Sequence, residues 1–203
     1  MKMMTEVEFD PKGHKYSING EEVPSVSELC RFISKEAYSG AADHHMKTAA
    51  DLGQRVHDAT YELDMKKTIS IDDPEVIPFI QAYAKFHKEH QVIWVERESI
   101  VHKGAEYAGR IDCYGLVDGV KTLVDIKSTS TITRKIKVLY TAAQNLYRKA
   151  MEPDMPVEAI CILHLKKDGN YRLIGLEIED TLADACLHLH NALKSTRRRK
   201  KND

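Results

Sequence analysis

The central segment of the chain, residues 109–127, constrains the fold more than any other part of the sequence. Two runs rich in β-branched and apolar residues flank the dipeptide Asp118-Gly119. Asp-Gly is a favoured two-residue hairpin turn, so the segment is predicted to form two antiparallel strands joined there. A turn at these two residues also fixes the register, and it places Asp112 directly opposite Asp125.

The predicted register gathers four charged side chains on one face of the hairpin. Side chains alternate along a strand, so Arg110 and Lys127 share a face with Asp112 and Asp125. Opposed Cβ atoms lie about 4.5–5.5 Å apart, where two like charges destabilise a sheet. A divalent cation would relieve that repulsion, and carboxylate oxygens are the ligands that Mg²⁺ and Mn²⁺ prefer. The opposite face is predicted to be ordinary core: Ile111, Cys113, Val117, Val124 and Ile126.

Lys127 stands two residues after Asp125, beside the predicted ion. Its amine could orient or help deprotonate a water, or stabilise charge on a phosphate. Two acids and a lysine around a metal are what phosphodiester hydrolysis requires, because the ion polarises the phosphoryl oxygen and generates hydroxide near neutral pH. The alternative is a surface hairpin whose acids form salt bridges with Arg110 and Lys127. The apolar neighbours favour the metal site, because burying a charged side chain in a strand costs free energy unless a functional partner such as an ion compensates it.

The rest of the pattern predicts alternating helices and strands. A hairpin around Asn19-Gly20 is expected within residues 7–23, followed by a helix that starts at a Ser25/Glu28 capping box. Further helices are predicted over about 41–66, from Asp73-Pro74 to about 90, over 138–152 and from 180 to about 194. Strands are predicted from the β-rich runs 92–95, 99–101, 110–117, 120–127, 159–165 and 171–178. Together these elements predict a layered α/β architecture.

Composition narrows the class of protein. The chain has 203 residues, which suits one large domain with a sizeable core. Its four cysteines are far apart and form no CxxC pair, so neither a disulfide framework nor a zinc ribbon is expected. No stretch approaches about 18 apolar residues, and a soluble intracellular protein is expected. The net charge of −1 argues against a protein that simply coats nucleic acid.

Asp112 followed by Asp125-Ile126-Lys127 resembles the core motif of the PD-(D/E)xK nuclease superfamily, which is an acid and then D/E-x-K on the next strand. Ile111 stands where the name motif has proline. The segment Gly53-Gln54-Arg55-Val56-His57 is similar to the G-x-x-x-H motif of RecB-like and phage (lambda-type) exonucleases. The resemblance covers roughly residues 7–180.

The resemblance implies three groups of site residues. The catalytic group would be Asp112, Asp125 and Lys127. The metal-binding group would be His57, Glu98, Asp112, Asp125 and Ile126. The substrate-binding group would be Gln144 and Tyr147, which resemble the family's Q-x-x-Y motif, with Arg148 and Arg110.

Some of these assignments leave alternatives open. Glu96 lies two residues before Glu98 on the same predicted strand face, so either acid fits the metal site. His57 also fits an ordinary, half-buried helical histidine. The helix that carries Gln144 and Tyr147 also fits a plain amphipathic helix.

The fold implied by the resemblance is a restriction-endonuclease-like, three-layer α/β fold with a mixed central sheet flanked by helices. A single nuclease-like domain would span residues 1–195, with the N-terminal hairpin and helices in 1–90 and the catalytic core in 91–195. Residues 196–203 would form a basic, disordered tail.

The implied activity is that of a Mg²⁺- or Mn²⁺-dependent exodeoxyribonuclease of phage or prophage type, acting in recombination or DNA processing with one or two ions. No iron–sulfur cluster is expected, because the chain lacks a close C-terminal cysteine group. The implied partners are DNA and a single-strand annealing recombinase in the bacterial cytoplasm, with no membrane; a homo-oligomer is left open. The alternative is a catalytically inactive DNA-binding or scaffold module that keeps the nuclease fold.

Overall fold

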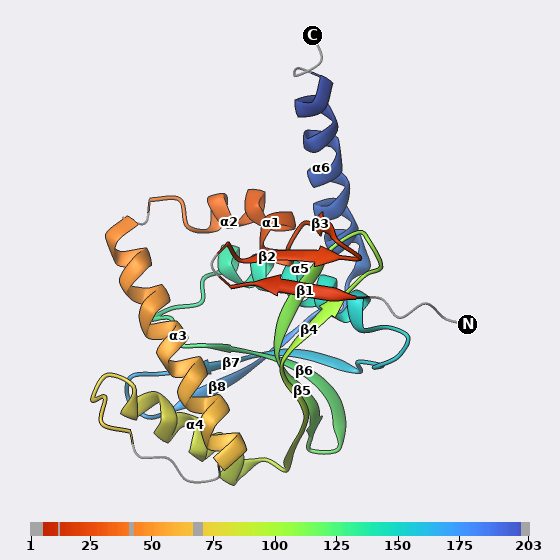
Figure 1. Ribbon diagram of the computed structural model, residues 1–203. Helices are drawn as coiled ribbons and strands as arrows, with labels where there is room; N and C mark the ends of the chain where they lie inside the picture. The colour runs from red at the N-terminus through yellow and green to blue at the C-terminus, as the bar shows by residue number, and fades with distance from the viewer. Residues whose placement is uncertain (1–5, 12, 41–42, 67–70, 200–203) are drawn as a thin grey trace.

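The structure is a computed structural model that describes residues 6–11, 13–40, 43–66 and 71–199 (Figure 1). It contains two sheets and six helices in these ranges. In chain order the elements are β1 (Val7–Asp10), β2 (Lys15–Ile18), β3 (Glu21–Val23), α1 (Val26–Leu29), α2 (Arg31–Ala37), α3 (Asp43–Lys66), α4 (Ile77–Glu89), β4 (Val92–His102), β5 (Ala108–Val117), β6 (Val120–Lys127), α5 (Arg134–Met151), β7 (Ala159–Leu165), β8 (Tyr171–Leu176) and α6 (Asp180–Arg199).

A five-stranded mixed sheet forms the middle layer, in the order β4-β5-β6-β7-β8. Its neighbours are antiparallel except β6 and β7, which run parallel. Parallel neighbours need a crossover connection, and α5 supplies it. Helices α3 and α4 cover one face of the sheet, and α5 with α1 and α6 covers the other (Figure 1). The predicted three-layer α/β fold with a mixed central sheet is therefore confirmed.

The two faces of the sheet bury separate cores. On the α3/α4 side, Val56, Tyr83 and Phe86 pack against Val124 and Ile126 of β6. On the other side the helices place a second apolar set against the sheet, in which the buried members include Leu29, Leu139, Leu146, Ile162 and Ala183. Burial of both faces explains why the central strands read as nearly continuous apolar runs.

The central hairpin adopts the predicted register. Cys113 pairs with Val124 and Val117 pairs with Val120, around a turn at Asp118-Gly119. Both turn residues have positive φ, 51° and 82°, as this kind of tight turn requires. The last pair of the β5–β6 ladder is Cys113–Val124, one step before Asp112 and Asp125. The carboxylates therefore lie where regular pairing ends.

Ile111 departs from the predicted core face. It packs with Leu123 and Met151 on the α5 side, whereas Cys113 packs on the α3/α4 side. The reason lies in the neighbouring strand, because the β4–β5 pairing passes over Glu98 and Asp112, and Glu98 has a φ of 50°. The side-chain alternation of β5 is broken at this point.

Several predicted boundaries shift. The Ser25 capping box is present, with Glu28 as its partner. Helix α4 begins at Ile77 rather than after Asp73, because Asp73 forms a turn in which its carboxylate accepts the N–H of Glu75. Helix α5 begins at Arg134, capped by the Thr133 hydroxyl, earlier than the predicted start at 138.

Helix α6 extends to Arg199, past the predicted end near residue 194, so residues 196–199 of the predicted tail are helical. Residues 200–203 lie outside the described ranges. None of the helices in those ranges combines the length and the apolar character needed to cross a membrane.

Candidate metal centre

Three elements bring one imidazole and two carboxylates together. His57 comes from α3, Glu98 from β4 and Asp112 from β5, and one donor atom from each lies within 4.8 Å of the others. His57 Nδ1 is 3.4 Å from Glu98 Oε1 and 3.6 Å from Asp112 Oδ2. All three side chains are half-buried at the same end of the β5–β6 hairpin. An imidazole nitrogen with two carboxylate oxygens is a donor set that can hold a divalent metal ion.

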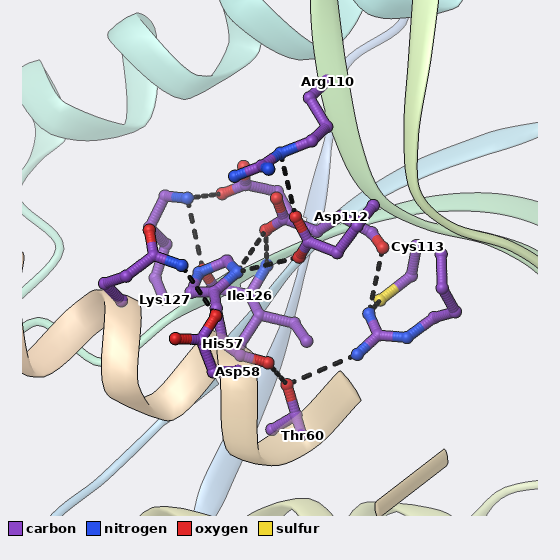
Figure 2. Close-up of polar contacts among 12 residues, drawn as sticks. His57, Asp58, Thr60, Arg110, Asp112, Cys113, Ile126 and Lys127 are labelled. Atoms are coloured by element: carbon purple, nitrogen blue, oxygen red, sulfur yellow. Dashed lines mark hydrogen bonds and ion pairs between the residues drawn. The ribbon is translucent and has the colours of Figure 1, made fainter. Parts of the chain in front are cut away.

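The main chain of Ile126 organises this group. Its N–H donates to Asp112 Oδ2 at 2.8 Å, and its carbonyl oxygen lies 2.9 Å from His57 Nε2 (Figure 2). A carbonyl only accepts, so Nε2 carries the proton of this hydrogen bond and Nδ1 faces the carboxylates. A hydrogen bond on the far nitrogen commonly fixes a metal-ligating histidine in this way.

Lys127 and Asp125 form the second part of the site. Lys127 Nζ lies 2.6 Å from Asp125 Oδ2, and it also donates to the carbonyl of Ile126 at 3.2 Å. Asp125 does not belong to the group of His57, Glu98 and Asp112 within 4.8 Å. The Ile126 carbonyl, which the resemblance assigns to the metal-binding group, accepts hydrogen bonds from His57 and Lys127. It thus holds the neighbouring groups in place.

The close charges shift the pKa values of the site. Burial raises the pKa of Asp125 to about 6, with Asp112 adding to the shift and Lys127 opposing it. Burial also pushes the pKa of Asp112 upward, but His57, Lys127 and the N–H of Ile126 outweigh it and hold that pKa below its usual value. The two carboxylates are therefore inequivalent, and Asp112 is the more readily ionised.

The two basic side chains of the site respond to the same charges. Burial lowers the pKa of His57, but Asp112 and Glu98 outweigh it, so the net shift is upward. For Lys127, burial is likewise outweighed by Asp125 and Asp112, and its pKa lies above the ordinary value. Lys127 is accordingly an ammonium ion at neutral pH.

Glu98, rather than Glu96, reaches the site. One oxygen of Glu98 faces His57, and the other forms an ion pair with Arg110 Nε at 3.0 Å. The Arg110 guanidinium in turn lies over the ring of Phe9, 5.7 Å from its centroid. Glu96 instead accepts a hydrogen bond from the Ser99 hydroxyl. The ambiguity left by the sequence is resolved by the positive φ of Glu98, which breaks the strand's alternation.

Of the predicted substrate-binding residues on α5, Tyr147 adjoins the site. Burial raises the pKa of its phenol, and the charges of Asp112 and Asp125 raise it further. A Cβ at position 109 would lie 2.5 Å from the Tyr147 ring, so Gly109 permits this close approach to β5. Gln144 is buried, and its Oε1 has no hydrogen-bond partner among the described residues.

Arg148 lies in a different environment. It is buried, its guanidinium forms ion pairs with Glu152 and Asp180, and its Nε donates to Asn145. These contacts connect α5 with the start of α6. The structure therefore places Arg148 in a structural ion-pair network and does not bring it to the metal centre.

Two residues that no sequence motif indicated, Tyr140 and Arg97, also contact the site. The ring of Tyr140 lies under Lys127 Nζ, 5.3 Å from the ring centroid, and its hydroxyl is 3.2 Å from that of Tyr38. Arg97 donates to the main-chain oxygen of Asp112 at 2.9 Å. Tyr140 stands one helical turn before Gln144, so the spacing offered a signal, whereas nothing local to Arg97 did.

No family model and no curated protein matches this sequence. Among solved structures, the crystal structure of a protein from Eubacterium rectale named "Putative exonuclease" is similar, with a TM-score of 0.52 and 17% sequence identity over 89% of this chain and 81% of that one. At this identity the likeness concerns the fold. The chain accordingly has a nuclease-like, three-layer α/β fold, and the His57–Glu98–Asp112 group lies at the end of its central hairpin.

Proposed function

We propose that this protein is a Mg²⁺- or Mn²⁺-dependent exodeoxyribonuclease of the PD-(D/E)xK superfamily, in its RecB-like and phage group. The observation that supports it best is the convergence of His57, Glu98 and Asp112 within 4.8 Å, next to the Asp125–Lys127 ion pair. The nuclease-like fold and the name of the Eubacterium rectale protein are consistent with this activity. A role in phage-type recombination beside a single-strand annealing partner is part of the same proposal.

The ligands proposed for the ion are His57 Nδ1 and the carboxylates of Glu98 and Asp112, with Asp125 as a further acid at the site. A bound ion would supply Lewis-acid polarisation of a phosphodiester and a water of lowered pKa. The protein holds its donors ready, because Ile126 fixes both His57 and Asp112 through its main chain. Preorganised donors and charges need little reorganisation during the reaction.

Lys127 would act as a cation. Its amine is positively charged beside Asp125, so it can donate hydrogen bonds to a water or to a non-bridging phosphate oxygen but has no lone pair to accept a proton. Its proposed role is to orient the attacking water and stabilise the developing negative charge. Arg110, held by Glu98, presents a second cation to the DNA backbone.

The activity is tested on end-labelled linear duplex DNA and on a covalently closed circle of the same sequence. The proposal predicts Mg²⁺-dependent release of nucleotides from the linear substrate and none from the circle. Asp112→Asn keeps an acceptor for the N–H of Ile126 but removes the charged ligand. We expect the nuclease activity of Asp112→Asn to fall by more than about 100-fold. This exceeds the loss that is typical when a residue that only supports a metal ligand is replaced.

Asp168→Asn is the matched control, because Asp168 is an acid in the β7–β8 turn whose carboxylate accepts the N–H of Asn170, two residues further along. It should retain wild-type activity. DNA binding without cleavage by the wild-type protein would favour an inactive DNA-binding module. Equal cleavage by Asp112→Asn would instead contradict the proposed role of Asp112 and of the centre it belongs to.

A further inference from the structure

Arg97 is a buried cation at the back of the metal centre. Its side chain is only 5% exposed, and its Nε forms an ion pair with Asp64 Oδ2 at 2.7 Å. Arg97 comes from β4 and Asp64 from α3, so the pair ties the helix that carries His57 to the strand that carries Glu98. A buried guanidinium is costly unless it is paired, and here an opposite charge lies beside Nε while both terminal nitrogens donate hydrogen bonds.

The oxygen of Asp64 that faces Arg97 has a second partner. This Oδ2 accepts a hydrogen bond from the Tyr83 hydroxyl at 2.7 Å, and that hydroxyl accepts one from the indole N–H of Trp94 at 2.8 Å. Tyr83 is fully buried on α4. The carboxylate that anchors Arg97 is therefore itself held by α4 and β4, and the guanidinium has little freedom to move.

The terminal nitrogens of Arg97 are linked to the main chain of two proposed metal ligands, directly for Asp112 and through Thr60 for His57. Its Nη1 donates to the carbonyl oxygen of Asp112 at 2.9 Å. Its Nη2 donates to the Thr60 hydroxyl at 3.3 Å, and that hydroxyl donates to the carbonyl oxygen of His57 at 2.9 Å (Figure 2). One guanidinium thus links the backbone of β5 at Asp112 to the backbone of α3 at His57.

The third proposed ligand, Glu98, is the next residue in the chain. Its φ of 50° is unusual for a residue other than glycine and costs free energy unless the surroundings impose it. Arg97 is paired with Cys113 and Ser99 with Ile111, so both neighbours of Glu98 are held in the β4–β5 ladder. The fixed side chain of Arg97 adds a further restraint on this short segment.

We propose that Arg97 is a positioning residue that sets the separations among His57, Glu98 and Asp112 and thereby the affinity of the centre for its metal. It acts through the main chain of the ligands and touches neither the ion nor the substrate. This inference rests on the proposed function, because it assumes that the three residues bind an ion.

The test compares the wild-type protein with Arg97→Lys and with Thr60→Val, by calorimetric titration with Mn²⁺ and by urea unfolding without metal. Arg97→Lys keeps the charge opposite Asp64 but loses the fork that reaches Asp112 and Thr60 together. Thr60→Val keeps the shape of a fully buried side chain and removes only the bridge to His57. We expect the Kd for Mn²⁺ to rise by about 10-fold in Arg97→Lys, as for other changes outside the ligand shell, and by less in Thr60→Val.

Tyr107→Phe is the control for stability. The buried Tyr107 hydroxyl donates to the Leu146 carbonyl at 3.0 Å, so its removal should destabilise the protein and leave the Mn²⁺ affinity unchanged. Saturating Mn²⁺ should restore the nuclease rate of Arg97→Lys, which a merely damaged fold would not allow. The double variant Arg97→Lys/Thr60→Val should lose less affinity than the two single effects combined, because both belong to one path.

The outcomes separate the two proposals. Absence of a saturable Mn²⁺ site in the wild-type protein would overturn the proposed function. A wild-type site together with folded Arg97→Lys and Thr60→Val proteins of unchanged Mn²⁺ affinity would overturn the role of Arg97 alone. If Arg97→Lys does not fold, Thr60→Val decides the question, and an unchanged affinity in that variant would count against the role.

Discussion

Asp112 and Ile126 are joined across the central hairpin by a hydrogen bond from the Ile126 N–H to the Asp112 carboxylate, at 2.8 Å. The last regular pair of the β5–β6 ladder is Cys113–Val124, so beyond this pair a side chain takes the place of a main-chain acceptor. The same residue, Ile126, also accepts a hydrogen bond from His57. The end of the hairpin thereby becomes a rigid frame for the proposed ligands.

Replacing the site lysine should separate metal binding from catalysis. Lys127→Met removes the cation next to Asp125 and keeps a similar length of side chain. We expect the rate at saturating Mg²⁺ to fall by about 10²–10³-fold, as for loss of one preorganised donor, while the Kd for Mn²⁺ changes far less. Steady-state nuclease assays and calorimetric titration measure the two quantities.

Lys121→Met is the control for this substitution, because Lys121 lies on the same strand with an exposed side chain. Its rate should match that of the wild type. A Lys127→Met protein that cleaves DNA at the wild-type rate would show that the lysine takes no part in the reaction.

Filling the space at Gly109 should destabilise the protein by crowding α5. A Cβ at this position would lie 2.5 Å from the Tyr147 ring and 3.1 Å from the Val26 side chain. Gly109→Ala is therefore expected to lower the free energy of unfolding in urea by about 1–3 kcal/mol, the usual cost of overpacking. Gly175→Ala is the matched strand control, since a Cβ there meets no atom within 4 Å. Equal stability of the two variants would contradict the close packing of Tyr147 on β5.

Acidification should destabilise the protein through His87. Burial lowers the pKa of its imidazole, and the nearby Arg97 lowers it further, while Asp64 at 3.6 Å opposes the shift. The unfolded chain therefore binds a proton at His87 more readily than the folded chain does. The stability associated with neutral His87 is present above about pH 6.5 and is lost as the pH falls through the lower pKa of the folded state.

The measurement is the free energy of unfolding in urea from pH 7.5 to 5, for the wild type and His87→Gln. As the pH falls, the free energy of unfolding of the wild type should decrease relative to that of His87→Gln. A difference that is independent of pH across this range would contradict a lowered pKa at His87.

The sequence predicted the parts of the fold and site that depend on local chemistry. The Asp118-Gly119 turn fixes the hairpin register, and apolar alternation fixes the strands on either side of it. The placement of His57 beside Asp112 came from a motif resemblance, and the structure brings the two residues together.

The parts that local pattern could not supply depend on tertiary packing. Arg97 and Arg148 are both buried arginines, yet only the packing of α3 on β4 and of α6 on α5 decides which acids they meet. The choice between Glu96 and Glu98 depends on one left-handed residue, which strand periodicity does not foresee. Ile111 lies on the α5 side of the sheet, opposite to its predicted face, where the β4–β5 pairing is interrupted beside Glu98.

The most direct test of the central claim is a crystal structure of the protein soaked in Mn²⁺, with anomalous scattering used to locate the ion. We expect an anomalous peak bonded to His57 Nδ1 and to carboxylate oxygens of Glu98 and Asp112, and we expect this peak to be lost in Asp112→Asn. A well-ordered site with no peak at saturating Mn²⁺, or a peak found only elsewhere on the molecule, would show that these three residues do not form a metal centre.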